Sequence, residues 1–224
     1  MDLKNFYGDA YSRIVKSFEP NESIIDFLNL QLPVLNDNPP ARKYLELGCG
    51  AGTHLNPSSD VWAVDFSEEA IKLAKADERF ESVHFSNQNV VSLDLDEKFD
   101  FILDAHLLHC LVSEQDRASY LKNVFNHLTN RGLFYVETMI SHKECTFESE
   151  LEYFFFEPVL QQGDNPFRYI DEAENIERLL INTGFKILYF YIDAGKRMIP
   201  ITGRKEALRS DPCVLRIIAT KEDK

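Results

Sequence analysis

The stretch Tyr44–His54 reads YLELGCGAGTH and joins a short apolar run to a glycine-rich segment. The apolar run is typical of a buried parallel strand. Glycines follow at alternate positions, Gly48, Gly50 and Gly52, and residues without a Cβ atom let the backbone turn sharply and approach a ligand closely. A strand that leads directly into such a loop usually begins a nucleotide-binding crevice in an open α/β sheet, although a bare turn would show the same glycines.

The next apolar segment favours the nucleotide-binding interpretation. Val61–Val64 is typical of a second strand and is followed by Asp65. An acidic residue at the tip of this strand is positioned to bind the two hydroxyl groups of a ribose. Ser67 is an expected N-cap, followed by two acidic residues and a helical pattern over Ala70–Ala76. The order of strand, glycine loop, strand, acid and capped helix therefore predicts a nucleoside site.

The segments ELGCGAGTH and WAVDFSEEAIKLAK together resemble the class I, Rossmann-like S-adenosylmethionine-dependent methyltransferases, from about Lys43 to Thr138. A nicotinamide-dependent dehydrogenase fits less well, because its fingerprint has the third glycine three residues after the second, and here the interval is two. The resemblance implies a single α/β domain. Its sheet would be seven-stranded and mostly parallel, with an antiparallel last strand and helices on both faces. The implied cofactor is S-adenosyl-L-methionine, with S-adenosyl-L-homocysteine as product.

The resemblance also implies a set of cofactor-binding residues. Glu46 matches an acid that commonly faces the methionine end of the cofactor, and Phe66 is placed to pack on the adenine. Asn89 stands where the family often has an acid that accepts a hydrogen bond from the adenine amino group, and an amide oxygen can do the same unless Asn89 is an ordinary turn residue. Tyr11 matches a tyrosine of a covering helix, although simple packing is an equal alternative. The full implied set is Glu46, Gly48, Cys49, Gly50, Gly52, Asp65, Phe66, Asn89, Val90, Asp104, Ala105 and Tyr11.

The segment FDFILDAHLLHCL resembles the fourth strand of small-molecule methyltransferases and the residues that follow it. Phe99–Asp104 is the expected strand, and its carboxyl end carries His106 and His109 to the crevice mouth, where open α/β sheets bind ligands. Histidine accepts a proton near neutral pH, so both are candidate general bases, unless they only cap or pack beside the strand. Asp104 is expected to shape the loop or the methionine end of the site.

One segment departs from the family. From Gly48 to Asp65 the chain advances 65 − 48 = 17 positions, about one helical turn (roughly four residues) fewer than we expect for the family. Pro57 lies within this interval and cannot continue a helix interior. We therefore expect little or no helix between the first two strands, and less cover over the methionine part of the cofactor.

Four parts of one methyltransferase domain are expected over residues 1–224. They are an N-terminal helical cover (1–40), a cofactor-binding core (41–140), a substrate or lid insertion (141–170) and a C-terminal helix with strands (171–224). In the core, Asn130–Gly132 is expected to turn into a fifth strand that Thr138 ends. The insertion is rich in aromatic residues, which could form a substrate pocket or merely seal the sheet. Val214–Thr220 is the expected antiparallel last strand.

Composition limits the class of partner. The 224 residues carry 24 basic and 37 acidic side chains, a net charge of −13, which disfavours a nucleic-acid substrate. A basic stretch from Lys196 to Arg209 is the exception, and a solvated loop is its simpler explanation. The four cysteines form no CxxC pair, so neither a metal site nor a disulfide framework is expected. With no signal or membrane-spanning segment evident, a cytoplasmic location is expected.

These observations favour a methyltransferase that acts on a small molecule. Two alternatives remain open at this level. The chain could be a non-catalytic, cofactor-binding partner of another protein, or a protein or RNA methyltransferase that uses the basic stretch.

Overall fold

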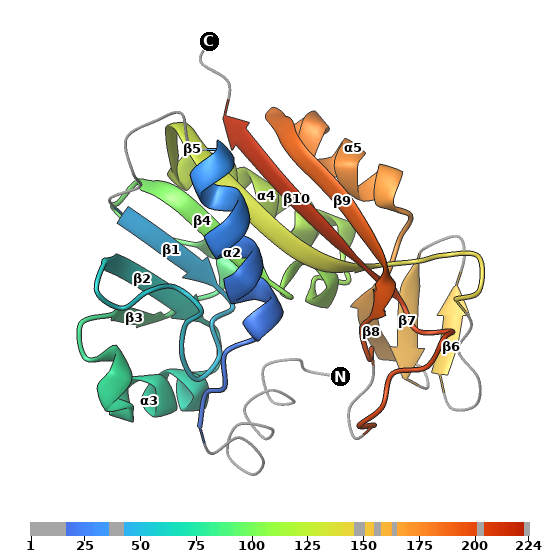
Figure 1. Cartoon of the computed structure of the whole chain (residues 1–224), viewed down its shortest axis with the longest axis horizontal. Coiled ribbons are helices and arrows are strands. Elements are labelled where there is room, and N and C mark those ends of the chain that lie inside the picture. Colours follow the sequence, from blue (N-terminus) through green and yellow to red (C-terminus); the bar gives the residue numbers. More distant parts are fainter. Residues whose placement is uncertain are drawn as a thin grey trace.

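A seven-stranded sheet organises the protein (Figure 1). The computed structural model describes residues 17–35, 43–145, 151–154, 158–162, 165–200 and 204–221. The strands of the sheet are β1 (Lys43–Leu47), β2 (Asp60–Asp65), β3 (His84–Asn87), β4 (Phe99–Ala105), β5 (Leu128–Ile140), β9 (Phe185–Arg197) and β10 (Cys213–Lys221). Their order is β3-β2-β1-β4-β5-β10-β9. Strand β10 runs antiparallel to both neighbours, and the pairs from β3 to β5 are parallel. The expected fold class is therefore confirmed.

Capping residues in the sequence mark several of the helix ends. The Ser67 hydroxyl accepts a hydrogen bond from the backbone N–H of Ala70 at 3.2 Å, and Ser113 starts a second helix in the same way. Gly184 ends a third with φ +108°, a backbone conformation that glycine adopts without strain. The helices are α2 (Glu22–Leu35), α3 (Glu68–Ala76), α4 (Glu114–His127) and α5 (Ala173–Thr183), with short 3₁₀ helices η1 (Glu78–Phe80), η2 (Val90–Ser92) and η3 (Leu108–Cys110).

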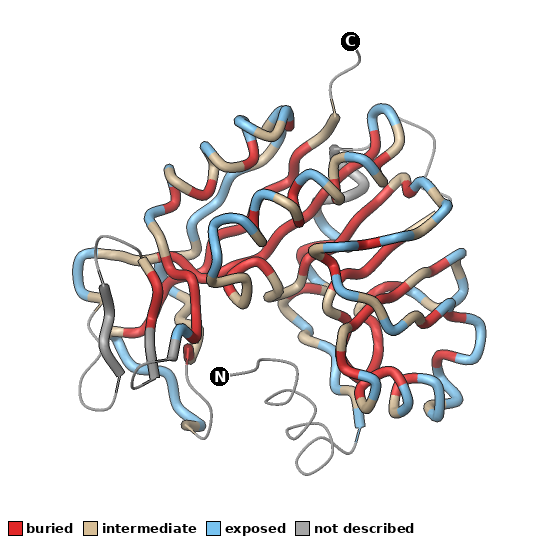
Figure 2. Tube along the Cα trace, turned by 180° about the vertical axis from the view of Figure 1, so that it is seen from behind, coloured by how far each residue is buried: buried red, intermediate tan, exposed pale blue. Residues whose placement is uncertain are grey.

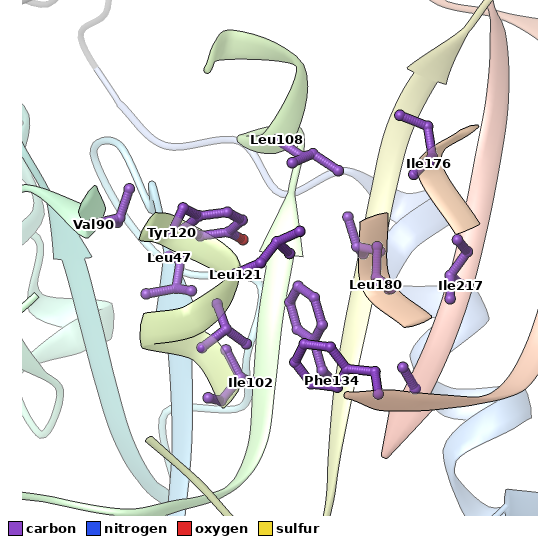
Figure 3. Close-up of a cluster of buried hydrophobic side chains, with 14 of the residues drawn as sticks. Leu47, Val90, Ile102, Leu108, Tyr120, Leu121, Phe134, Ile176, Leu180 and Ile217 are labelled. Carbon is purple, nitrogen blue, oxygen red and sulfur yellow. The ribbon is translucent and has the colours of Figure 1, made fainter. Parts of the chain in front are cut away.

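Alternate residues of the central strands point to opposite faces of the sheet, and helices cover both faces. Figure 3 shows Leu121 of α4 and Leu180 of α5 lying against the sheet beside Phe134 of β5. Tyr135, the next residue of β5, packs instead in a cluster with side chains of α2 and α3. Buried residues accordingly run along the strands, while the outer faces of the helices are exposed (Figure 2). This packing fixes the strand ends that carry the site.

The first crossover has no helix, as the short spacing predicted. Between β1 and β2, residues 48–59 form only turns and bends. Leu55 from this segment is buried in the cluster on the α2 side of the sheet, so the short connection still contributes to the core. Within the described residues, no helix has the length and apolar character needed to cross a membrane.

The segment after β5 differs from the expectation. Strand β5 extends from Leu128 to Ile140, so Asn130–Gly132 is not a separate turn and Thr138 does not end the strand. Arg131 has φ +63°, and the pairing of β5 with β4 shifts register nearby, so an irregularity within one strand replaces the turn. A three-stranded antiparallel sheet follows, made of β6 (Leu151–Phe154), β7 (Val159–Gln162) and β8 (Asn165–Tyr169). It lies beyond the carboxyl end of β5 (Figure 1).

Candidate active site

The glycine loop turns sharply at the end of β1. Gly48 and Gly50 have φ values of +68° and +62°, which side-chain-bearing residues rarely adopt. The backbone N–H groups of Gly48 and Cys49 donate to the carbonyl of Val64 at 2.8 and 3.0 Å, which ties the loop to β2. A Cβ at Gly48 would lie 3.0 Å from Cδ1 of Leu107, so the loop also packs closely on the segment after β4.

Asp65 at the end of β2 holds the loop from the other side. Its carboxylate accepts hydrogen bonds from the backbone N–H of Gly50 at 2.9 Å and of Ser67 at 2.8 Å. Burial raises the pKa of Asp65 above its ordinary value, and the Ser67 and Gly50 N–H groups offset part of that rise. A carboxylate has about four lone-pair sites, so the backbone N–H groups of Gly50, Ser67 and Phe66 still leave acceptor capacity for a hydroxyl group of a ligand.

Glu46, which the family resemblance implies at the methionine end of the cofactor, is contacted by residues of the loop after β1. Its buried carboxylate accepts hydrogen bonds from the Thr53 hydroxyl and from the backbone N–H of His54, and the ring Nδ1 of His54 lies 2.6 Å from Oε1. Burial lowers the pKa of His54, but the charge and hydrogen bond of Glu46 outweigh it, so the pKa is raised overall. The residues that replace the missing crossover helix thus bind this acid, and Glu46 does not line the main cavity.

Asp104 supports the loop that follows β4. Its buried carboxylate accepts hydrogen bonds from the Tyr120 hydroxyl at 2.6 Å and from the backbone N–H groups of Leu107 at 2.6 Å and Leu108 at 3.0 Å. Burial raises the pKa of Asp104 to about 7, against the lowering effect of these donors. Asp104 therefore shapes the loop, in agreement with the expectation, and is not itself at the cavity wall.

A cavity of about 800 Å³ lies at the carboxyl ends of β1, β2 and β4. Of the residues implied for cofactor binding, Gly48, Asp65, Phe66, Asn89, Val90 and Ala105 line it, and both candidate histidines do so too. Cys49, Gly50 and Gly52 form the loop behind the wall, and a Cβ at Gly52 would overlap the ring of Phe18. The Asn89 side chain accepts a hydrogen bond from the backbone N–H of Val91 at 3.0 Å and so caps η2. Tyr11 lies outside the described residues.

His106 has an unusual backbone conformation for a residue with a side chain. Its φ is +78°, and its backbone N–H donates to the carbonyl of Glu137 at 3.1 Å. Its ring Nε2 lies 2.8 Å from Oε1 of the same glutamate, and the side chain remains 31% exposed. Left-handed conformations of such residues cost about 1–3 kcal/mol and cluster at functional sites. The geometry therefore singles out His106 among the cavity-lining residues.

Glu137 contacts His106, and the sequence did not single it out. It lies on β5, is fully buried, and accepts a hydrogen bond from Nε of Arg216 at 2.6 Å. Burial alone would raise its pKa, but the hydrogen bonds and positive charges of His106, Arg216 and Lys196 lower the pKa to about 2. Arg216 and Lys196 both donate to the Ser23 hydroxyl at 2.8 Å, so the same cluster attaches α2 to the site.

The low pKa of Glu137 makes a testable contribution to stability. Because the pKa is about 2 in the folded chain and about 4.5 in the unfolded one, ionised Glu137 stabilises the fold by about 3 kcal/mol. This contribution is fully present above pH 4.5 and is lost as the pH falls toward 2. We expect the difference in unfolding free energy between wild type and Glu137→Gln to shrink by about 2 kcal/mol between pH 7 and pH 3. Urea unfolding measures it, and a pH-independent difference would contradict the assignment.

His109 is in a different environment from His106. It is almost completely buried, and its Nδ1 lies 3.3 Å from the Thr138 hydroxyl. Burial, with the positive charges of Arg168 and His106, lowers the pKa of His109 well below its ordinary value. His109 thus forms part of the wall as a neutral ring, and it is a weaker proton acceptor than an exposed histidine would be.

The far end of the cavity comes mainly from the C-terminal third of the chain. Arg168 of β8 and Lys196 and Arg197 of β9 line it, together with Met139 and Met198. Lys196 and Arg197 belong to the basic stretch that was interpreted as a solvated loop, but they lie in an unexpectedly long strand, and that interpretation is wrong for them. In the sequence, the signal for this placement was that Lys196 and Arg197 lie at the end of the strand next to the last strand.

A second cavity of about 510 Å³ lies beside α2. Phe18, Leu28, Tyr44 and His54 line it, whereas Asp65, His106 and His109 do not. This second cavity lies next to the short connection between β1 and β2. Its described lining includes neither Asp65 nor the glycines of the loop.

Comparison with known proteins agrees with this geometry. A family model described as a methyltransferase domain matches residues 39–174, which is more than half of the chain. The protein belongs to the S-adenosylmethionine-dependent methyltransferases of the Rossmann-like class. The matched range contains the glycine loop, Asp65, His106 and Glu137, so the family assignment covers most of the residues that line the cavity.

The relatives and solved structures align with different shares of this methyltransferase. The malonyl-[acyl-carrier protein] O-methyltransferase of Bacillus anthracis is 30% identical over 102 residues, which is 43% of this chain. The match spans 37% of that relative's length. An S-adenosylmethionine-dependent methyltransferase from Clostridium acetobutylicum superposes with a TM-score of 0.66 at 19% identity, covering 99% of this chain and 100% of the other. The N-methyltransferase NodS from Bradyrhizobium japonicum, solved with S-adenosyl-L-homocysteine, also gives 0.66, at 14% identity over 99% of this chain and 100% of the other.

Gly48 offers a direct test of the loop in this methyltransferase. An alanine at φ +68° costs about 1–2 kcal/mol, and its Cβ would press on the cavity-lining Leu107. We expect Gly48→Ala to weaken binding of S-adenosyl-L-homocysteine by about 10-fold in calorimetry. Gly195→Ala is the matched control, because the nearest atom to a Cβ there lies 3.6 Å away. Equal affinities of the two variants would contradict this role for the loop.

Proposed function

We propose that this methyltransferase transfers a methyl group to a small-molecule acceptor, with His106 as the general base and Glu137 as its positioning residue. The observation that carries the proposal is a single cavity with two different ends. Asp65 and Asn89 line the end next to β2 and β3, and His106 stands between them and a far end of basic and apolar side chains. Ligand cavities are commonly about 300–1,000 Å³, so the volume suits a nucleoside cofactor and a small acceptor together.

The residues at the first end fit an adenosyl cofactor. The glycine loop allows close approach at Gly48, Asp65 retains acceptor capacity for ribose hydroxyl groups, and Phe66 and Val90 provide apolar surface for an adenine. When bound, S-adenosylmethionine supplies a methyl group on a sulfonium that a nucleophile displaces in line, leaving S-adenosylhomocysteine. Because that methyl group is already activated, the main task of the protein is alignment, which can contribute about 7–11 kcal/mol.

His106 is arranged to take a proton from the acceptor. With Nε2 directed at Glu137, the neutral ring carries its proton on Nε2, and the lone pair of Nδ1 is left to accept a second one. The negative charge of Glu137 then stabilises the imidazolium that forms, as a buried carboxylate does beside a catalytic histidine. The proton of the acceptor atom would pass to Nδ1 of His106 as that atom takes up the methyl group.

The molecule that receives the methyl group distinguishes the small-molecule proposal from its alternatives. The RNA hypothesis depends on the basic stretch, but Arg204 pairs with Asp211, and Arg209 pairs with Glu144 at 2.7 Å. These pairs reduce the positive charge that could face a phosphate backbone. The name of the Bacillus relative raises an acceptor carried on an acyl-carrier protein as another possibility.

A labelled-methyl transfer screen tests the proposal. The enzyme is incubated with methyl-labelled S-adenosylmethionine and, in separate arms, a metabolite panel, acylated acyl-carrier protein, total RNA and a protein extract. We expect label in the small-molecule fraction. Label confined to the acyl-carrier protein, RNA or protein arm would overturn the small-molecule acceptor, and cofactor binding without transfer in any arm would favour the non-catalytic partner.

A further inference from the structure

We propose that two copies of this methyltransferase associate through strand β9, which pairs antiparallel with the β9 of the second copy around a two-fold axis at Phe190. Strand β9 is the last strand of the seven-stranded sheet, and β10 is its neighbour on one side (Figure 1). Within the described parts of the chain, no strand pairs with its other side. Such an edge presents backbone N–H and C=O groups that can extend the sheet into another chain.

The central run of this strand is suited to pairing. Residues Ile187–Ile192 read ILYFYI and contain no charged residue, proline or glycine. Among the described residues, the backbone groups of this run make no hydrogen bond except those to β10. A charge or a proline within an edge strand commonly prevents its pairing with another chain, and this run has neither.

The side chains of the same run form an exposed apolar patch. Seven large apolar side chains are exposed in the described part of the chain, and four of these lie on β9. The four are 37–44% exposed and are Leu188, Phe190, Tyr191 and Ile192. Neighbouring exposed apolar side chains of this size often mark a protein interface.

The pairing with β10 shows which of these side chains share a face of the sheet. Phe190 and Ile192 lie opposite β10 residues of the cluster packed by α4 and α5. Tyr189 and Tyr191 lie on the other face, where Tyr189 packs in the α2 cluster. Leu188 has no partner on β10, so it forms a bulge, and the alternation of faces shifts by one residue there.

An antiparallel copy with Phe190 at the axis joins apolar or aromatic side chains of the same face throughout the run. The pairs across the axis are Phe190 with Phe190, Tyr189 with Tyr191 and Ile187 with Ile192. The bulge at Leu188 is what brings Ile187 opposite Ile192. Aromatic and β-branched pairs of this kind stabilise antiparallel strands, so the strand is complementary to a second copy of itself.

The charges beside the run suit the same register. The next pair outward is Lys186 with Asp193, which occurs twice by symmetry and opposes unlike charges. Asp193 already accepts hydrogen bonds from the backbone N–H groups of Gly195 and Lys196 and from Arg216 at 3.4 Å. The pair therefore favours this register, and the affinity comes from the backbone and the apolar side chains. A chain of net charge −13 repels its copy, and an uncharged central run keeps that repulsion away from the contact.

Sedimentation equilibrium of the full chain tests the association. We expect a wild-type dimer with a Kd of about 1–100 μM, as for a small interface. Phe190→Lys places two positive charges at the axis and should weaken the dimer at least about 10-fold. Leu30→Lys is the matched control, because Leu30 is an exposed apolar residue on α2. It should dimerise as wild type does.

Phe190→Cys tests the register. Opposite residues of an antiparallel pair have Cα atoms about 4.5–5.5 Å apart, which a disulfide can span. Oxidised glutathione converts the two thiols to a disulfide and is itself reduced to two molecules of glutathione. We expect a covalent dimer in Phe190→Cys, and none in Leu30→Cys or in wild type, which reports on the native cysteines. This variant also decides the question if Phe190→Lys does not fold by circular dichroism.

Several results would overturn the pairing. They are a wild-type chain that stays monomeric at about 200 μM, a dimer that survives Phe190→Lys, or equal cross-linking in Phe190→Cys and Leu30→Cys. A dimer that dissociates in about 0.5 M salt would do so too, because it would be held by charges. Residues Ile187–Ile192 do not line the cavity, so affinity for S-adenosyl-L-homocysteine should change less than about twofold in every variant. The dimer is thus tested independently of the proposed function.

Discussion

Replacing Asp65 with alanine is expected to weaken binding of S-adenosyl-L-homocysteine by about 100-fold or more. The carboxylate is 6% exposed, so removing it leaves the N–H groups of Gly50 and Ser67 without an acceptor. It also removes the acceptor proposed for the ribose hydroxyl groups. Hydrogen bonds to a charged group each contribute about 1.5–3 kcal/mol, and every 1.4 kcal/mol corresponds to about 10-fold in affinity. Isothermal calorimetry measures the change.

Asp60 provides the control for Asp65. It lies at the opposite end of the same strand, is largely exposed, and does not line the cavity. Asp60→Ala should bind S-adenosyl-L-homocysteine as wild type does. If Asp65→Ala retains wild-type affinity while remaining folded by circular dichroism, the acid at the end of β2 does not bind the nucleoside.

His106→Gln is expected to lower kcat by about 10²–10⁴ while leaving the affinity for S-adenosyl-L-homocysteine within about twofold of wild type. Glutamine keeps a polar side chain of similar reach but cannot accept a proton at neutral pH. The effect belongs to the chemical step, because the ring is held toward the acceptor end by Glu137 and does not support the glycine loop. Once an acceptor is known, single-turnover methyl transfer measures it.

Comparing His109→Gln with His106→Gln distinguishes a general base from a residue that only packs in the cavity wall. His109→Gln changes a buried ring beside Thr138 whose pKa is already well below its ordinary value, so its effect on kcat should be less than about 10-fold. A larger loss in His109→Gln than in His106→Gln would reverse the assignment of the base.

Local sequence was enough to predict the first half of the cavity. The glycine loop, the acid at the end of β2, the Ser67 cap and the fourth strand are each encoded within a few consecutive residues, and their order fixes the sheet. The missing crossover helix was predictable for the same reason, because Pro57 and the spacing to Asp65 leave no room for it.

Contacts between distant residues explain what the sequence did not reveal. Glu137 and Arg216 are 79 positions apart, and only the pairing of β5 with β10 brings them together. The shortened loop also places Thr53 and His54 on the carboxylate of Glu46, and the sequence pattern did not indicate these contacts. The small sheet after β5 was also missed, because its strands are short and its aromatic residues suit a pocket as well as a strand.

A crystal structure of the complex with S-adenosyl-L-homocysteine tests the central claim most directly. We expect the nucleoside in the cavity of about 800 Å³, with both ribose hydroxyl groups within about 3.2 Å of the Asp65 carboxylate and the sulfur facing His106. A nucleoside bound instead in the cavity beside Tyr44 and His54, or one whose ribose lies away from Asp65, would contradict the account.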